Sequence, residues 1–334
     1  MNIYDVSQQA GVSIATVSRV MNGNPNVSEK TKQKVLDVMK EIGYTPNVFA
    51  RGLGLNTMKT IGIMCADSSD PFLANAVYYL EQNLRKSGYD SFLCCTGYEL
   101  HNKQKYLKLL LSKRVDAIVM VGSSFLESNK KDNAYIIEAA KEVPIMLING
   151  YLNHSNIYCT LCDDHQAVYD IVNRLIKENR KHILYLYHSK SYSGLQKLNG
   201  YKDAIHANDL PLEDGLMQLC TNNMYETKDQ LLHLYQNGLK FDAVVAAEDV
   251  LAIGSLKFAK AAGLKIPEDI CVIGYNNSIL ATCCDPELTS IDNHVETLCI
   301  TTINTLMRVL GGHDVPNKTT ISNDLILRDT TNFR

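Results

Sequence analysis

Seven short apolar runs recur from residue 60 onward, separated by stretches with helical spacing. They read TIGIMCA, SFLCCT, AIVMVGS, PIMLING, HILYLY, AVVAAE and CVIGYN. Strands that are apolar along their whole length are buried on both faces, which is typical of parallel sheets covered by helices. Between the first two runs, Val77, Leu80 and Leu84 share one helical face, and Gly88 is expected to end that helix. The pattern predicts an α/β body with more strands than one sheet domain holds comfortably.

Length and composition are those of a globular protein that acts inside the cell. A chain of 334 residues suggests two or three domains. No apolar run approaches the roughly 18 residues that span a bilayer. The N-terminus has neither the basic start nor the apolar stretch of a signal peptide, so we expect a cytoplasmic protein without a membrane partner. Several of the ten cysteines lie in apolar runs, where we expect them to be reduced.

The net charge of −3 conceals an asymmetry along the chain. Residues 1–60 hold seven Lys and Arg against four Asp and Glu, which leaves 26 against 32 for the rest. The first 60 residues therefore carry +3 and the remainder −6. An excess of this size is common on solvated surfaces, but its position favours a small polyanion-binding head on an acidic body.

Three short helices are predicted at the N-terminus. Residues 4–10 form the first pattern, Gly11 allows a tight turn, and Ser13 suits the N-cap of a second helix that reaches about Met21. Two short helices joined by a glycine-containing turn are typical of a helix-turn-helix unit. The third helix is expected to begin at Ser28 after a hydrophobic staple at Val27 and to end at Gly43. Its expected inner face consists of Val35, Leu36, Val38, Met39 and Ile42.

The second of these helices is predicted to read DNA. In helix-turn-helix units its first residues meet base edges in the major groove, while hydroxyl and amide side chains hold phosphates. Periodicity alone leaves an amphipathic surface helix as an equally good reading. The segment IYDVSQQAGVSIATVSRVMNGNPNVSEKTKQKVLDVMKEIGYTPNVFARGL, however, resembles the DNA-binding head and hinge of the lac repressor family nearly without a break. The resemblance implies a head over 1–45 and a hinge helix with linker over 46–59.

The resemblance also implies roles for individual residues of the head. Ile14 and Ala15 occupy the variable base-reading pair, and Arg19 occupies the place of a third reader. An arginine binds a guanine edge bidentately, whereas Ile14 and Ala15 offer only apolar contact, suited to a thymine methyl. Specificity is therefore expected to depend heavily on Arg19. The positions expected to contact or orient on the DNA backbone are Tyr4, Ser13, Thr16, Ser18, Asn22, Ser28, Tyr44 and Asn47.

The hinge is expected to fold only on DNA. After Pro46, which suits a helix start, the segment NVFARGLG looks like the hinge helix of the family. Ala50 is expected to contact DNA there, and Leu53 stands at the position of the leucine that enters the minor groove. Gly52 and Gly54 disfavour a helix that is already marginal at this length. A plain linker is the alternative, and amide exchange of residues 48–53 with and without operator DNA distinguishes the two.

The body resembles the rest of the same family. The phrases that carry this likeness are TIGIMCADSSDPF, KQKYLKLLLSKRVDAIVMVGS, AAEDVLAIGSLKFAKAAGLKIPEDICVIGYNNS and DPELTSIDN. The resemblance implies two doubly wound parallel-sheet subdomains of periplasmic-binding-protein type I. The first is expected over 60–159 and 290–318, and the second over 160–289 and 319–334. A small ligand is expected in the cleft between them, at the carboxyl ends of the strands.

The resemblance places five residues in this cleft. They are Phe72, Leu73, Lys197, Glu248 and Asn276. The last three depart from the family pattern, in which Arg, Asn and Asp are common and form a polar clamp for a sugar or base. Lysine is a point charge and lacks the bidentate fork of arginine. We expect a polar, sugar-like effector with altered contacts; an ion pair between Lys197 and Glu248, with no response to small molecules, is the alternative.

Catalytic and metal sites are less well supported. Cys159 and Cys162 form a C-x-x-C pair, but NIYCTLCDD predicts a strand, on which residues three apart point to opposite faces. No P-loop, dinucleotide fingerprint or nucleophile elbow occurs in the sequence, so we expect neither an enzyme nor a cofactor. His188 is expected to lie at the surface or to cap an element, and Asp163 with Asp164 to cap a helix.

Together these features predict a DNA-binding transcriptional regulator, most simply a repressor. We expect a homodimer on a pseudo-palindromic operator, since the C-terminal sequence LILRDTTNFR shows no apolar heptads for a coiled coil. A small molecule in the cleft would modulate operator affinity. The rival from another class is a solute-binding protein of a transport system, and a sugar-acting enzyme is the third reading; neither explains the N-terminal head.

Overall fold

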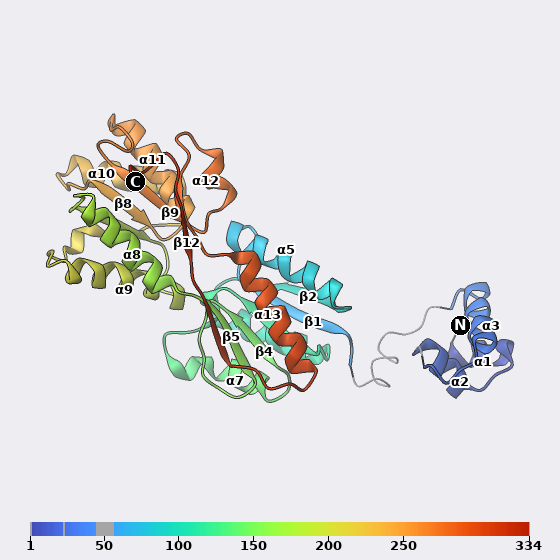
Figure 1. Ribbon diagram of the computed structural model, residues 1–334. Helices are drawn as coiled ribbons and strands as arrows, with labels where there is room; N and C mark the ends of the chain where they lie inside the picture. The colour runs from blue at the N-terminus through green and yellow to red at the C-terminus, as the bar shows by residue number, and fades with distance from the viewer. Residues whose placement is uncertain (1, 23, 45–56, 334) are drawn as a thin grey trace.

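A small helical head and a larger α/β body make up the protein in a computed structural model that describes residues 2–22, 24–44 and 57–333. Figure 1 shows the head apart from an elongated body with two halves. The predicted fold class, an all-α head with two parallel-sheet subdomains, is confirmed. Within the described ranges, no helix is both long enough and apolar enough to cross a membrane. The predicted hinge helix lies outside the described residues.

The head consists of α1 (Ile3–Ala10), α2 (Ile14–Met21) and α3 (Glu29–Glu41). Gly11 ends α1 with a φ of 61°, a left-handed conformation that glycine adopts without steric penalty. Ser28 caps α3 by accepting a hydrogen bond from the Thr31 amide at 3.3 Å. These features confirm the three predicted helices and the turn that joins the first two.

The head buries a small apolar core, formed by Val6, Ala10, Val17, Val20 and Val35, with further apolar residues packed around it. One residue of the predicted inner face of α3 differs. Leu36 is 41% exposed, whereas Val38, Met39 and Ile42 are partly buried against the core. A three-helix core is narrow, so the face of α3 that it covers does not extend to a residue directly beside Val35. The prediction for Leu36 was wrong.

The first half of the body is a six-stranded sheet with helices on both faces. The strand order is β11-β5-β4-β3-β1-β2, and all pairs are parallel. Figure 1 shows α13 beside α5, although they are far apart in sequence. The strands are β1 (Thr60–Cys65), β2 (Asp90–Cys95), β3 (Ala117–Val121), β4 (Ile145–Ile148), β5 (Ile157–Cys162) and β11 (Lys318–Ile321). The helices are α5 (Pro71–Lys86), α6 (Leu100–Ser112), α7 (Ala134–Ala140) and α13 (Val295–Leu310), with short 3₁₀ turns η1 (Ser123–Phe125) and η2 (Lys130–Asn133).

The second half repeats this architecture. Its strand order is β12-β10-β9-β8-β6-β7, parallel except for the β10–β12 pair. The strands are β6 (Ile183–Tyr187), β7 (Met217–Leu219), β8 (Ala243–Ala246), β9 (Cys271–Tyr275), β10 (Thr289–Asp292) and β12 (Asp324–Ile326). The helices are α8 (Asp164–Lys177), α9 (Tyr192–Ala207), α10 (Met224–Gln236), α11 (Asp249–Ala262) and α12 (Ile279–Cys283), with the 3₁₀ turn η3 (Asp214–Leu216).

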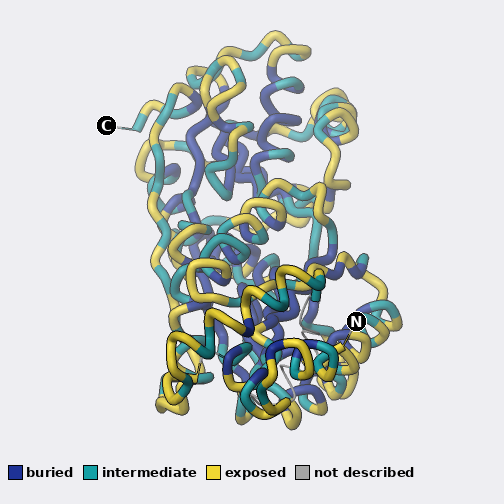
Figure 2. Tube along the Cα trace, turned by 90° about the vertical axis from the view of Figure 1, so that its right-hand side faces the viewer, coloured by how far each residue is buried: buried dark blue, intermediate teal, exposed yellow. Residues whose placement is uncertain are grey.

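The seven apolar runs of the sequence all form strands in these two sheets. Six of the seven, including β1, β3 and β9, are fully or almost fully buried, as continuous apolar sequence predicts. Figure 2 shows buried residues along the sheet interiors and exposed residues on the outer helices. The run SFLCCT differs, because it forms the edge strand β2, where Phe92 and Leu93 are exposed. The helix expected between the first two runs is confirmed as α5.

Three crossings of the chain join the two halves. They follow β5, β10 and β11, which end at Cys162, Asp292 and Ile321. The boundaries expected at 160, 290 and 319 fall inside these strands, so each lies a few residues too early. The reason is that β10 pairs within the second sheet and β11 within the first. A strand sequence gives no signal for the point at which the backbone passes from one sheet to the other.

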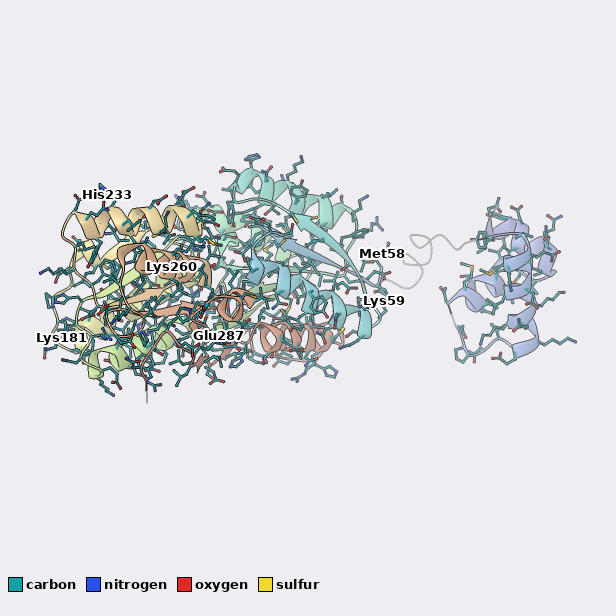
Figure 3. The ribbon with its side chains drawn as sticks, turned by 90° about the horizontal axis from the view of Figure 1, so that it is seen from above. Met58, Lys59, Lys181, His233, Lys260 and Glu287 are labelled. Atoms are coloured by element: carbon teal, nitrogen blue, oxygen red, sulfur yellow. The ribbon has the colours of Figure 1, made fainter. Side chains whose placement is uncertain are left out.

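The body begins in a hydrogen-bonded anchor next to the linker. The carboxylate of Asp116 accepts bonds from the Met58 amide at 2.9 Å, from the Thr57 hydroxyl at 2.8 Å and from the Thr60 amide at 3.1 Å. Figure 3 shows Met58 and Lys59 at the end of the body nearest the head, with Lys181 and His233 at the far end. These bonds fix residues 57–60 to the start of β3 in the first subdomain.

Candidate DNA interface and effector cleft

The N-terminus of α2 presents a small polar surface. The Ser13 hydroxyl accepts a hydrogen bond from the Thr16 amide at 3.1 Å and lies 2.9 Å from the Thr16 hydroxyl. This N-cap begins the helix at Ile14 and leaves Ile14 and Ala15 exposed. Arg19, in the last turn of α2, is exposed and forms no ion pair within the part of the head that the structure describes. Its guanidinium is available to a ligand.

The other predicted DNA contacts fall into three groups. Tyr4, Ser13 and Ser28 are exposed, and Thr16, Ser18, Asn22 and Tyr44 are half-buried. Tyr44 packs against the head core, and the Asn22 amide group lies 3.5 Å from the Ser18 hydroxyl. The Asn22 Oδ1 is buried without a hydrogen-bond partner among the described atoms. Asn47, Ala50 and Leu53 lie outside the described residues.

A cavity open to solvent lies between the two body subdomains, with about 720 Å³ of empty space that includes the solvent at its mouth. All five residues expected in the cleft, namely Phe72, Leu73, Lys197, Glu248 and Asn276, line it. Phe72 and Leu73 come from the N-terminus of α5, and Lys197 comes from α9. Glu248 follows β8 and Asn276 follows β9, so the cavity lies at the carboxyl ends of parallel strands.

Lys197 is held on the floor of this cavity. It is 6% exposed, and its Nζ donates to the Ala247 carbonyl at 3.0 Å. The same ammonium lies 3.6 Å from the centroid of the Tyr275 ring, a cation–π contact. The described residues show no ion pair between Lys197 and Glu248, so the alternative drawn from the sequence does not describe this geometry. Lys197 instead supplies a fixed positive charge beneath the ligand space.

Glu248 faces the cavity from the N-terminus of α11. Its side chain is 20% exposed, and its Oε1 lies 3.7 Å from the Nδ1 of His188. Burial raises the pKa of Glu248 to about 7; Lys197 opposes this shift and Asp70 adds to it. Burial also lowers the pKa of His188, and Lys197 lowers it further. His188 is therefore a cavity residue with a neutral imidazole at pH 7, and the expectation of a surface or capping role was wrong.

A buried carboxylate supports the floor from below. Asp164 accepts hydrogen bonds from the Ser193 hydroxyl and the Tyr275 hydroxyl, both at 2.5 Å. Burial raises the pKa of Asp164, and Lys197 acts in the opposite direction. The predicted capping role belongs to Asp163, whose carboxylate accepts from the Gln166 amide at 3.3 Å. Asp164 lies just after the chain crosses from β5 to the second subdomain, and its hydrogen bonds to Ser193 and Tyr275 connect this crossing to the floor of the cleft.

Several cavity residues were not predicted from the sequence, because they come from segments that are far apart from one another along the chain. The Ser123 hydroxyl, after β3, donates to the Ser191 hydroxyl at 2.8 Å and thereby links the two subdomains. Asn293, on the second crossing, donates to the Asn276 Oδ1 at 2.8 Å. One signal was available, because polar residues that directly follow a buried strand meet at one edge of the sheet. Polar residues missed on the cavity wall are Asp70, Tyr98, Ser123, Ser124, Asn149, Asp164, Ser189, Ser191, Ser193 and Asn293.

Cys159 and Cys162 lie on β5, as the sequence predicted. The Cys159 sulfur lies 3.8 Å from the Leu152 carbonyl, and the Cys162 sulfur lies 3.4 Å from the Asn293 carbonyl. Residues three apart on a strand face opposite sides, and these two thiols have partners in different parts of the body. The two thiols therefore do not face a common ligand site.

Comparisons with known proteins agree with the architecture. Residues 2–47 match the family described as bacterial regulatory proteins of the lacI family. Residues 58–329 match the family described as periplasmic binding proteins and the sugar-binding domain of the LacI family. The chain is 80% identical over 333 residues to an HTH-type transcriptional regulator from Lachnoclostridium phytofermentans, with full coverage of both chains.

Solved structures of other regulators share this fold, among them two that cover nearly the whole chain. The lac repressor dimer bound to operator and the anti-inducer ONPF has a TM-score of 0.89 at 23% identity, with coverage of 99% of this chain and 98% of that chain. A complex of the transcriptional regulator CelR with cellobiose has a TM-score of 0.73 at 23% identity, with coverage of 99% and 100%. At this identity the two matches bear on the fold alone.

Proposed function

The chain belongs to the LacI family of bacterial regulatory proteins and is a DNA-binding transcriptional regulator, and from that premise we propose that it is a repressor whose operator affinity changes when a small polyhydroxy molecule binds its cleft. We also propose that it acts in the cytoplasm as a homodimer. Each head would then contact one half of a pseudo-palindromic operator.

The proposed DNA contacts centre on the N-terminus of α2. Arg19 would bind a guanine edge, and Ile14 with Ala15 would contact a neighbouring thymine methyl. Tyr4, Ser13 and Ser28 are exposed on the head and would bind phosphates. The charge of the head supports this assignment, because residues 1–60 carry a net +3 on a chain whose remainder is acidic.

The proposed effector site is the cavity between the subdomains. Five residues expected from the sequence to bind an effector converge on it from both halves, and this convergence carries the proposal. A ligand that contacts both walls favours one relative orientation of the halves over another, which is the condition for a shift in their equilibrium. The anchor at Asp116 would pass that shift to the linker and so change the spacing of the two heads.

A titration of labelled operator DNA tests the proposal. Purified protein is titrated at constant, near-physiological salt, because affinity for DNA depends steeply on salt. The titration is repeated with each member of a panel of mono- and disaccharides. At least one member is expected to change the operator Kd by roughly 5- to 150-fold, the usual span of allosteric coupling. If operator binding is tight but no sugar changes it, the protein is a regulator without this response.

A further inference from the structure

Two carboxylates from opposite subdomains face the same cavity. Asp70 caps α5 of the first subdomain, where its Oδ1 accepts from the Leu73 amide at 2.9 Å. Glu248 precedes α11 of the second subdomain, and its side chain makes no capping bond. Asp70 raises the pKa of Glu248, so the two carboxyl groups interact across the cleft. A ligand between the subdomains meets both.

Among the described residues around the cavity, one positive side chain, Lys197, opposes these carboxylates, and its charge favours the ionised form of Glu248. Lys197 is the one lysine or arginine among the described residues that line the cavity, and its Nζ is already bound to the Ala247 carbonyl and the Tyr275 ring. The buried carboxylate of Asp164 interacts with that same ammonium. The imidazole of His188 is neutral at pH 7, because burial lowers its pKa. An anionic ligand would therefore meet repulsion here.

A second observation, an unpartnered acceptor on the cavity wall, favours a ligand that donates hydrogen bonds. Asn293 lines the cavity and is 2% exposed, and its Oδ1 is buried with no hydrogen-bond partner among the described atoms. Its amide nitrogen already donates to the Asn276 Oδ1, whereas its oxygen accepts from no described atom. A buried polar atom without a hydrogen-bond partner is unfavourable. Ligand groups that donate, such as hydroxyl or ammonium groups, fit this wall better than carbonyl or phosphate oxygens.

We propose that the effector carries a protonated amino group beside its hydroxyls, as in an amino sugar, and that this ammonium group binds between Asp70 and Glu248. The inference rests on the proposed function of the cavity as the effector site. The ammonium pairs with one carboxylate from each subdomain, so it stabilises the orientation in which the two walls are close. The hydroxyls of the sugar face the serine and asparagine side chains of the cavity.

This arrangement makes binding depend on pH in a defined direction. Glu248 must be ionised to pair with the ammonium, so affinity rises as pH increases through the pKa of about 7. Affinity falls again only where the ligand amine loses its proton. The charged and titratable groups that act on Glu248 from neighbouring elements are Lys197 on α9, Asp70 before α5, Asp164 on α8, Asp249 on α11 and His188 after β6.

The test uses the full chain and a matched set of sugars. Each mono- or disaccharide is offered in four forms: the parent with a hydroxyl, the amino-deoxy form, its N-acetyl derivative and the 6-phosphate. Binding is measured by calorimetry at pH 6.0, 7.0 and 8.0, and operator binding is measured on the same preparation. For at least one sugar, the amino form is expected to bind about tenfold or more tightly than its parent, with the phosphate weakest.

Two variants and one control assign the effect to the carboxylates. Glu248→Gln and Asp70→Asn each remove a charge with little change in volume, and asparagine retains the ability to cap α5. Each is expected to lower the preference for the amino form to about twofold or less. Glu248→Gln also removes the rise in affinity between pH 6.0 and 8.0. Glu142→Gln, at an exposed position in the first subdomain, is expected to leave both properties unchanged.

The possible failures are distinguishable. If parent sugars bind as tightly as their amino forms, or if phosphates bind best, the amine inference is wrong and the effector site remains. If sugars of every form fail to bind while operator binding is intact, the proposed effector function is wrong, and the amine inference fails with it. If both variants retain the full preference for an amine, the ammonium does not bind between Asp70 and Glu248.

Discussion

Replacing Glu248 with glutamine should make the protein more stable at alkaline pH. In the folded chain the pKa of Glu248 is raised from 4.5 to about 7, chiefly by burial. The folded state therefore holds this proton more tightly than the unfolded state does. The stability that this provides is fully present below pH 4.5 and is lost as pH rises through 7.

The size of the effect follows from the shift in pKa. One pKa unit corresponds to 1.36 kcal/mol, so the ionised Glu248 destabilises the folded state by about 3 kcal/mol above pH 8. Glutamine cannot ionise and has nearly the shape of protonated glutamate. We expect the free energy of unfolding of Glu248→Gln to exceed that of the parent protein by about 3 kcal/mol at pH 8 and by less than about 1 kcal/mol at pH 5. The corresponding increase in Tm at pH 8 is roughly 5 to 10 °C.

Thermal melts followed by far-UV circular dichroism measure this difference. The chain has no tryptophan, so fluorescence is a poorer probe. Melts at pH 5, 6, 7 and 8 compare the parent protein, Glu248→Gln and the exposed control Glu142→Gln. The gain in Tm should grow with pH for Glu248→Gln alone. A gain that is the same at every pH, or a loss at pH 8, would refute the assignment of this raised pKa to Glu248.

Three further substitutions probe the head and the cleft floor. Arg19→Ala should weaken operator binding by about 1–3 kcal/mol and relax the preference at one base pair per half-site; equal weakening on all sequences would instead indicate a phosphate contact. Ser13→Ala removes the hydroxyl that accepts from the Thr16 amide and should destabilise the head by about 1 kcal/mol, measurable as faster amide exchange in α2. Tyr275→Phe keeps the ring under Lys197 but removes the donor to Asp164, and should lower the free energy of unfolding by about 2 kcal/mol in urea titrations. An unchanged urea midpoint would show that the bond contributes nothing.

Local patterns were enough to predict most of the fold. Buried strands such as β3 and β9 are apolar along their whole length, and α1 to α3 have clear caps at both sequence and structure level. The missed strands are short and lack a continuous apolar run. For example, β7 has only three residues, and β11 reads KTTI with alternating exposure. Such strands are defined by pairing with a neighbour, which a single sequence does not reveal.

The cleft was predicted in part for a related reason. Lys197, Glu248 and Asn276 were identified by family resemblance, and all three line the cavity. Asp164 and Asn293 were not, because their positions depend on where the chain crosses between the two sheets. Burial makes Asp164 part of the floor, whereas from sequence it has the features of an ordinary helix cap. Its role follows from tertiary packing, which no local pattern specifies.

Selection of binding sites from a random duplex library, at fixed near-physiological salt, tests the central claim most directly. The purified parent protein and Arg19→Ala are selected in parallel, and the recovered sequences are compared. A regulator that binds as a dimer through α2 should recover a two-fold symmetric site, and Arg19→Ala should lose the preference at one position in each half. Recovery of no preferred sequence by the parent protein, or of the same site with undiminished preference by Arg19→Ala, would contradict the account.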